Sequence, residues 1–290
     1  MTGLLQYIVG GLAAGSLYAL AALGLTLVYK TTGVVNFAHG EMAMVSTFVA
    51  FVLLAGFKLP YPVAFLGALV FAAALGIALE RVFMRPVQQS SHLNQIMVTL
   101  GLFLVLNGIV STRVFEPLPF PKPVGGPPLA FAQVVVSRDS LLIFGVTTAL
   151  MLALYLFFRY TLAGVALRAT AQNLVAARLM GVLAGRAYAT TWAVAAVLGA
   201  VAGMLIAPTT SLNPNFMGEV AIKAFASAIL GGLGNLVGAI VGGLVLGVLE
   251  NLIAGYVSTE LKAAFAFSVI LLVLVVRPQG IMGAPVRRRV

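Results

Sequence analysis

The stretch from residue 4 to residue 28, LLQYIVGGLAAGSLYALAALGLTLV, contains no charged residue and precedes Lys30. The hydrocarbon core of a bilayer is about 30 Å thick, so a helix needs about 20 predominantly apolar residues to cross it. This stretch is longer than a signal-peptide core, and no basic residue precedes it. It therefore predicts a membrane-spanning helix that is retained.

Seven further stretches have a similar apolar character. They are roughly Met42–Phe57, Pro62–Leu79, Ile96–Thr112, Leu141–Phe158, Tyr188–Ala207, Leu236–Ile253 and Ala263–Val276. A shorter piece, Ala221–Leu230, is about half the required length, so we expect a half-helix or the first arm of a broken helix. The sequence thus predicts an all-α polytopic membrane protein. It would have about eight transmembrane helices plus one short broken or re-entrant helix, in a single domain over residues 1–290.

The composition agrees with a membrane protein. Hydrophobic residues make up 61% of the chain and charged residues only 8%, against roughly 25% charged residues in soluble domains. The formal net charge is +10, which in a soluble protein would suggest nucleic acid. In a polytopic membrane protein, basic residues instead indicate which loops face the cytoplasm, and we expect no nucleic-acid partner.

The loops give an orientation. Residues 159–187 contain four arginines and no acidic residue, which predicts a cytoplasmic loop. The 80–92 loop and the tail with Arg277 and Arg287–Arg289 should lie on the same side, whereas the proline-rich 113–139 loop suits an external connection. Counting back from the arginine-rich loop places the N-terminus outside. Counting forward returns the tail to the cytoplasm only if Ala221–Leu230 also crosses, or if one boundary is wrong.

Signatures of catalysis and metal binding are absent from the sequence. No Gly-Lys dipeptide occurs, so there is no Walker A phosphate loop. The two histidines, His39 and His92, lack metal-ligand spacing, and there is no cysteine to supply a thiolate. We therefore expect no catalytic site, no metal site and no cofactor bound by this chain. If ATP drives its function, a partner subunit must use it.

Glycines recur at the spacing that brings helices close together. Gly234, Gly238 and Gly242 are four residues apart, as are Gly243 and Gly247, and near the N-terminus Gly11 and Gly15. In lipid, rows of small residues let helix backbones approach and pack by dispersion. We expect these glycines to hold the bundle together, and the alternative is a sliding surface between moving parts.

The most unusual polar cluster is Asn36-Phe37-Ala38-His39-Gly40-Glu41, between the first two apolar stretches. Ionisable groups at membrane depth cost roughly 2.5–3.5 kcal/mol each, so they usually face a cavity or a partner. The stretch Met42–Phe57 is short for a span and reaches full length only if it includes Gly40 and Glu41. We therefore expect Asn36, His39 and Glu41 to be buried near a cavity; the alternative is a solvated loop.

A second polar stretch, Asn213–Glu219, resembles the first. Asn36-Phe37 followed by Gly40-Glu41 matches Asn215-Phe216 followed by Gly218-Glu219, with one residue fewer between. Many transporters consist of two related halves with discontinuous helices near the substrate. Asn215 and Glu219 are therefore candidates, with Asn36, His39 and Glu41, for lining or gating a passage.

The cytoplasmic 159–187 loop contains a predicted helix. No proline or glycine interrupts Arg168–Met180, and Gly181 is a plausible helix stop. The residues that share one helical face are Leu167, Ala171, Leu174 and Arg178. Such a helix could rest on lipid headgroups or insert into a cleft of a soluble ATPase, and its small residues suit the protein cleft better.

Three motifs together resemble the Liv-type branched-chain amino-acid permeases of bacterial ABC importers. They are GVVNFAHGE at residues 33–41, the segment from Arg168 through Ala171-Gln172-Asn173 to Arg178-Leu179-Met180-Gly181-Val182, and LGGLGN at residues 230–235. The resemblance extends over essentially the whole chain. It implies the fold of an ABC importer permease in the bacterial inner membrane.

The resemblance also implies partners and roles. This chain would form half of a pore with a second, unlike permease, two cytoplasmic ATP-binding subunits that use the ATP, and a periplasmic substrate-binding protein. The candidates for contact with the ATPase are Arg168, Gln172, Ala177, Arg178 and Gly181. Urea and amide importers share the motifs and stay open as an alternative. An ion-coupled carrier, with Glu41, Glu219 and Glu250 as its only tempting acids, is a less favoured one.

Overall fold

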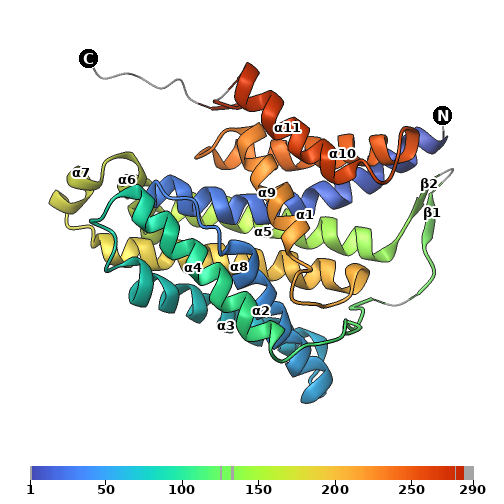
Figure 1. Ribbon diagram of the computed structural model, residues 1–290, viewed down its shortest axis with the longest axis horizontal. Coiled ribbons are helices and arrows are strands. Elements are labelled where there is room, and N and C mark those ends of the chain that lie inside the picture. Colours follow the sequence, from blue (N-terminus) through green and yellow to red (C-terminus); the bar gives the residue numbers. More distant parts are fainter. Residues whose placement is uncertain (1, 125, 132–133, 278, 284–290) are drawn as a thin grey trace.

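The computed structural model describes residues 2–124, 126–131, 134–277 and 279–283, and it is almost entirely helical (Figure 1). Arg287–Arg289, expected on the cytoplasmic side, lie outside the described residues. The elements are α1 (Thr2–Thr32), α2 (His39–Phe51), the π-helical turn η1 (Val52–Gly56), α3 (Tyr61–Leu79), the π-helical turn η2 (Glu80–Met84), α4 (His92–Ser111), β1 (Leu129–Phe131), β2 (Val134–Val136), α5 (Arg138–Tyr160), α6 (Leu162–Gln172), α7 (Leu174–Leu179), α8 (Ala184–Thr210), α9 (Gly218–Gly231), α10 (Leu236–Tyr256) and α11 (Lys262–Val276).

The predicted spans correspond to helices. Within the described residues, seven helices are long and apolar enough to cross a membrane. They include α2 and α3, which η1 and η2 lengthen to His39–Gly56 and Tyr61–Met84. The eighth expected span is α11, which has 15 residues. The chain is thus a multi-pass membrane protein, as predicted.

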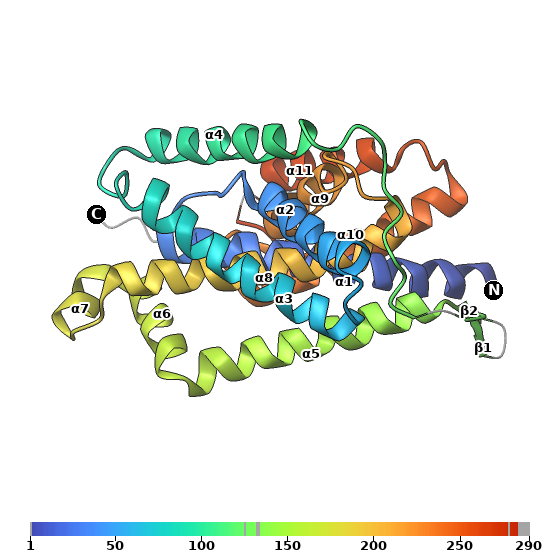
Figure 2. The same ribbon diagram turned by 90° about the horizontal axis from the view of Figure 1, so that it is seen from below.

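Helix α1 forms the centre of the bundle. Together with α8 it is the most deeply buried of the spans, and α8, α9 and α10 pack around it (Figures 1 and 2). Its large buried side chains, such as Leu20 and Leu23, pack in the same core as Trp192 and Leu198 of α8. Helices α4 and α5 lie at the periphery and bury less of their surface.

The loops gather at two ends of the molecule. At one end the side chain of Gln6 bonds the backbone of Val135, and Leu118 pairs with Leu212. There β1 and β2 form an antiparallel hairpin within the proline-rich connection, with Leu129 opposite Val136. The opposite end carries α6 and α7 and is rich in arginine (Figure 1). This second end is the one that the basic residues predict to face the cytoplasm; we call it the cytoplasmic end and the opposite one the external end.

The short helix α9 runs between these two ends. It follows the 211–217 segment, whose Leu212 pairs with Leu118, and it ends at the turn where Ile281 N–H donates to Leu230 O. Its 14 residues span about 21 Å at 1.5 Å per residue, so the preceding segment must cover the remaining depth. Ile281, which follows α11, therefore lies against the end of α9, and the number of membrane crossings stays a prediction.

Backbone atoms of α1 and α10 meet at the predicted glycines. A Cβ placed on Gly15 would lie 2.7 Å from the carbonyl oxygen of Gly243, and one on Gly243 would lie 2.6 Å from the backbone nitrogen of Ala19. Gly11 is equally close to Val248. These contacts agree with the packing role expected for glycine rows in membranes.

Replacing Gly243 by leucine is expected to force α1 and α10 apart. The clashing atoms belong to the backbone of Ala19, which cannot rotate away as a side chain can. Overpacking costs about 1–3 kcal/mol where side chains can yield, and we expect the upper end of that range or more here. The thermal midpoint of the purified protein should fall clearly. Gly145→Leu is the control, because a Cβ at Gly145 meets no atom within 4 Å, and its thermal midpoint should stay unchanged. If Gly243→Leu and Gly145→Leu have equal midpoints, the close approach of α1 and α10 is contradicted.

The predicted cytoplasmic helix is broken, contrary to expectation. Helix α6 ends at Gln172, and α7 begins at Leu174. Asn173 between them has an extended backbone (φ −155, ψ 102), and its side-chain oxygen accepts a hydrogen bond from Ala176 N–H. Asn173 thus acts as the N-cap of α7, a role that asparagine favours over a helix interior. Gly181 follows α7 with φ +85, as suits a residue that stops a helix.

Candidate functional site

The first polar stretch is buried at the start of α2. The side-chain oxygen of Asn36 accepts a hydrogen bond from Ala38 N–H (3.0 Å), and its carbonyl accepts one from His39 N–H (3.3 Å). Asn36, His39 and Glu41 are each at most 3% exposed. The His39 ring packs against Gly24 of α1 and Gly199 of α8. The burial predicted from the shortness of the second span is therefore confirmed.

The second polar stretch makes a similar turn before α9. The side-chain oxygen of Asn213 accepts from Asn215 N–H (2.9 Å), and the carbonyl of Asn215 accepts from Gly218 N–H (2.9 Å). In both stretches an asparagine side chain closes a turn, and an asparagine carbonyl receives the first N–H of the helix. Asn215 and Glu219 are exposed, unlike the three residues of the first stretch.

The structure brings the two helix starts together. A Cβ on Gly40 of α2 would lie 3.0 Å from the Cβ of Ala221 of α9. Helix α2 leads away toward the external end, whereas α9 leads toward the cytoplasmic end, so only their N-termini meet. Neither helix has a side-chain cap at its N-terminus. This arrangement matches the discontinuous helices that line transport sites in other membrane proteins.

Asn107 of α4 links both stretches and was missed in the sequence analysis. Its side-chain nitrogen lies 3.3 Å from Glu41 Oε2, 3.1 Å from Pro214 O and 3.2 Å from Asn215 Oδ1. One amide group of α4 thus holds the N-terminal ends of both discontinuous helices. The available signal was an asparagine in the middle of an apolar span, a position where polar side chains usually bond to another helix.

A cavity of about 530 Å³ lies beside the paired helix starts. Asn36, His39 and Glu41 contribute to its wall from one side, and Gly218 and Ala221 from the other. Most of the remaining lining is apolar and comes from α4, α9 and α11. Three of the five candidate passage residues therefore line one cavity. Asn215 lies next to it through Asn107, and Glu219 is part of a separate network.

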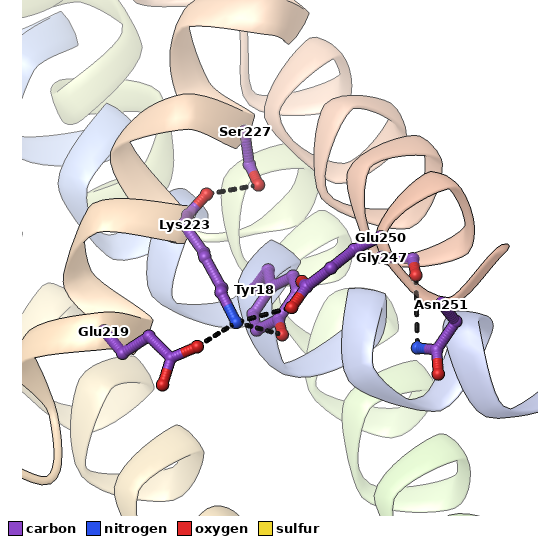
Figure 3. A network of polar contacts seen from close by, with 7 residues as sticks. All are labelled: Tyr18, Glu219, Lys223, Ser227, Gly247, Glu250 and Asn251. Carbon is purple, nitrogen blue, oxygen red and sulfur yellow. Dashed lines mark hydrogen bonds and ion pairs between the residues drawn. The ribbon is translucent and has the colours of Figure 1, made fainter. Parts of the chain in front are cut away.

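A buried lysine lies at the centre of that network (Figure 3). Lys223 of α9 is 5% exposed, and its Nζ lies 2.6 Å from Glu250 Oε1 of α10 and 3.2 Å from the hydroxyl of Tyr18 of α1. It also forms an ion pair with Glu219 one turn earlier. The group therefore joins three helices through one cation and two carboxylates.

Lys223 was not among the functional residues predicted from the sequence. Its signal was the spacing of Glu219 and Lys223 by four residues inside an apolar run, which places both on one face of a helix. The partnership with Glu250 depends on how α9 and α10 are turned toward each other. Glu250 is 2% exposed and is paired with a cation rather than free for ion coupling.

At the cytoplasmic end, four of the five candidate ATPase contacts are exposed. Arg168, Gln172, Arg178 and Gly181 face solvent, whereas Ala177 is 4% exposed and packs within its own chain. In α7 and the residue that follows it, the most exposed apolar side chains are Leu179 (84%) and Met180 (86%), together with Val175 (67%). We call Val175, Leu179 and Met180 the α7 tip.

A second ion pair anchors this end. Glu80 is fully buried, and its carboxylate pairs with Arg85 at 2.8 Å and accepts a hydrogen bond from Gln88. The same arginine donates to the carbonyl of Gly185 at the start of α8. The segment after α3 is therefore fixed to α8 next to the α7 tip.

Comparison with known proteins decides the family. A sequence model described as "Branched-chain amino acid transport system / permease component" matches residues 7–275. The chain belongs to this permease family. It is 37% identical to the high-affinity branched-chain amino acid transport system permease protein LivH of Salmonella typhimurium and, again at 37%, to that of Escherichia coli K12; each match covers 97% of this chain and 96% of the relative. BraD of Pseudomonas aeruginosa is 36% identical over the same shares.

A solved structure shares the fold. PsaBC from Streptococcus pneumoniae, determined in complex with Fab, superimposes with a TM-score of 0.50 at 15% identity, covering 93% of this chain and 91% of that one. At this identity the likeness concerns the fold alone. The resemblance inferred from the three sequence motifs is confirmed, and so is the expected permease fold. The family is one of transport permeases and not of enzymes.

Proposed function

We propose that this permease is a transmembrane subunit of an ATP-driven, binding-protein-dependent importer of branched-chain amino acids. The observation that carries the proposal is the match to LivH and BraD over nearly the whole chain. Those relatives are named as permease proteins of high-affinity branched-chain amino acid transport systems. The described chain acts as one transmembrane permease domain in the bacterial inner membrane and forms half of the pore.

The passage runs beside the paired starts of α2 and α9. Asn36, His39 and Glu41 line it from the start of α2, and Asn215 borders it through Asn107. Glu219 pairs with Lys223 beside this region and remains our candidate for gating. Support comes from the cavity and from the contact of two uncapped helix N-termini beside it. The cavity is partly walled by exposed apolar side chains such as Phe37 and Phe267, which the second, unlike permease would cover.

Energy reaches this permease through the cytoplasmic end. Two ATP-binding subunits use the ATP, and this chain binds no cofactor itself. The α7 tip exposes apolar side chains to the cytoplasm, where contact with a folded protein would remove them from water. The α7 tip is flanked by the exposed residues Arg168, Gln172, Arg178 and Gly181. Ala177 lies buried behind it. A periplasmic binding protein delivers the substrate at the external end.

The test is transport by the reconstituted complex in proteoliposomes. We expect ATP-dependent uptake of labelled leucine, isoleucine or valine that requires the binding protein and continues when an ionophore dissipates ion gradients. Labelled urea and acetamide serve as competing substrates in the same preparation. Uptake of urea in place of leucine would refute the proposed substrate. Uptake that persists without ATP and stops with the ionophore would refute the proposed energy source.

A further inference from the structure

The cavity beside the starts of α2 and α9 has a chemical character of its own. Its walls are mostly apolar, with the aromatic rings of Phe37, Phe103 and Phe225 and the aliphatic side chains of Leu100, Ile222 and Ile270. At about 530 Å³, it falls within the range of about 300–1,000 Å³ that is typical of small-molecule sites. The walls suit a ligand whose body is apolar.

One carboxylate in this cavity has unused bonding capacity. Glu41 is 3% exposed and lines the wall. Its Oε2 receives the long hydrogen bond from Asn107, whereas its Oε1 receives none from the described residues. Among the described residues no lysine or arginine forms a salt bridge with Glu41. The acids that do form salt bridges are Glu80, Glu219 and Glu250. A buried carboxylate without a counter-ion is expensive unless something else supplies the positive charge.

The second set of groups consists of backbone N–H donors at the two helix starts, where only the first donor of each helix is already bonded, His39 N–H to Asn36 O and Gly218 N–H to Asn215 O. Helices leave their first N–H groups without intrahelical acceptors, and both Ala38 before α2 and Met217 before α9 provide no side-chain cap. The positive ends of two helix dipoles thus meet beside the cavity, an arrangement that favours an anion. His39 also lines the cavity and is 3% exposed, with its ring packed against Gly24 of α1 and Gly199 of α8.

We propose that this cavity is a transit site for a zwitterion with an apolar side chain. The ammonium group binds Glu41 Oε1, the carboxylate binds the uncapped N-termini of α2 and α9, and the apolar side chain lies against Phe103, Ile222 and Phe225. This inference rests on the proposed function, because an α-amino acid with a branched side chain has this combination of groups.

A simpler role for Glu41 is to offset the dipole of its own helix. Glu41 lies in the first turn of α2 and Glu219 in the first turn of α9, where acids are favourable. Such a role requires neither an open cavity nor apolar walls next to the carboxylate. The two explanations differ in what they predict for ligands that lack one charge.

The test measures ligand binding to the assembled complex in nanodiscs, without the binding protein, by saturation-transfer difference NMR. The probes are L-leucine, 4-methylpentanoate (no ammonium), 3-methylbutylamine (no carboxylate) and urea, with the signal from empty nanodiscs subtracted. We expect saturation of the leucine methyl protons, with signals at least fivefold weaker for the two singly charged analogues and none for urea.

Two variants locate the site. Glu41→Gln keeps the shape and the contact with Asn107, and it should lower the leucine signal at least fivefold while leaving the 4-methylpentanoate signal unchanged. Ile222→Trp narrows the cavity while keeping the carboxylate of Glu41 and should also abolish the leucine signal, so the test survives if one variant fails to fold. Glu260→Gln, a change at an exposed acid of the external end, should have no effect.

Two results would overturn the transit site: equal signals from leucine and 4-methylpentanoate, or a leucine signal that both variants leave unchanged. ATP-driven uptake by the same preparation separates this failure from failure of the proposed function. If leucine is imported but does not bind here, the transit site is wrong and the importer stands. If urea is imported instead of leucine, the proposed substrate is wrong as well.

Discussion

Replacing Lys223 by methionine is expected to destabilise the folded protein severely. Methionine has a similar length but no charge, so it leaves Glu250, 2% exposed, without its cation at 2.6 Å. Removing one partner of a buried ion pair costs about 3–5 kcal/mol, because the other charge stays buried and uncompensated. The total stability of a domain is only about 5–15 kcal/mol. We therefore expect a large loss of folded protein.

The measurement is the yield of monodisperse complex and its thermal midpoint in detergent. Lys122→Met removes a lysine from the exposed external loop and should leave both values unchanged. Combining Lys223→Met with Glu250→Gln should recover much of the loss, because the buried negative charge is then gone. If the double variant is no more stable than the single one, the ion pair is not the cause. Glu250→Gln alone should be milder, since Lys223 keeps Glu219.

Placing an aspartate at Leu179 is expected to abolish ATP-driven uptake while the chain still folds. The side chain is 84% exposed within this chain, so the change removes no internal packing. In the complex, burying such a side chain against a partner contributes about 1.5–3 kcal/mol, and a charge placed there must also lose its water. We expect at least a tenfold loss of uptake, accompanied by loss of the ATP-binding subunits during purification.

The control for the α7 tip introduces the same charge nearby. Gln89→Asp lies at the same end of the molecule and is exposed, and it should import substrate normally. Normal uptake by Leu179→Asp, with the ATP-binding subunits still attached, would place the docking surface elsewhere. A charged residue at Ala177 is a less informative test, because Ala177 is buried in its own chain and the variant would disturb folding and docking together.

Much of the fold could be predicted because the composition of a short stretch of sequence is enough to show that it inserts into a membrane. Uninterrupted apolar runs such as Leu4–Val28 must be helices, since lipid leaves the backbone no other partner than itself. The shortness of Met42–Phe57 was enough to predict that Glu41 is buried. The break at Asn173 was not predicted, because helix-forming neighbours outweighed its capping tendency in the sequence. The capping tendency of Asn173 determines the local structure only in the folded chain, where the loop must turn back toward α8.

The residues missed are those whose meaning depends on a distant helix. Lys223 and Asn107 each contact two other parts of the chain, and nothing near them in sequence identifies those partners. Likewise, Leu179 and Ala177 are neighbours of similar character in sequence, yet one is exposed and the other buried. Burial of that kind follows from how α7 packs against the rest of the chain, which the local sequence pattern does not show.

The glycine contacts between α1 and α10 limit how this permease can move. Because backbone meets backbone at Gly15 and Gly243, a shift by even one residue would drive a side chain into the opposite helix. These two helices therefore form a rigid frame. Helix α4, in contrast, is joined to the starts of α2 and α9 through the amide of Asn107. Opening and closing of the proposed passage should then depend on hydrogen bonds that exchange partners, while the frame keeps its register.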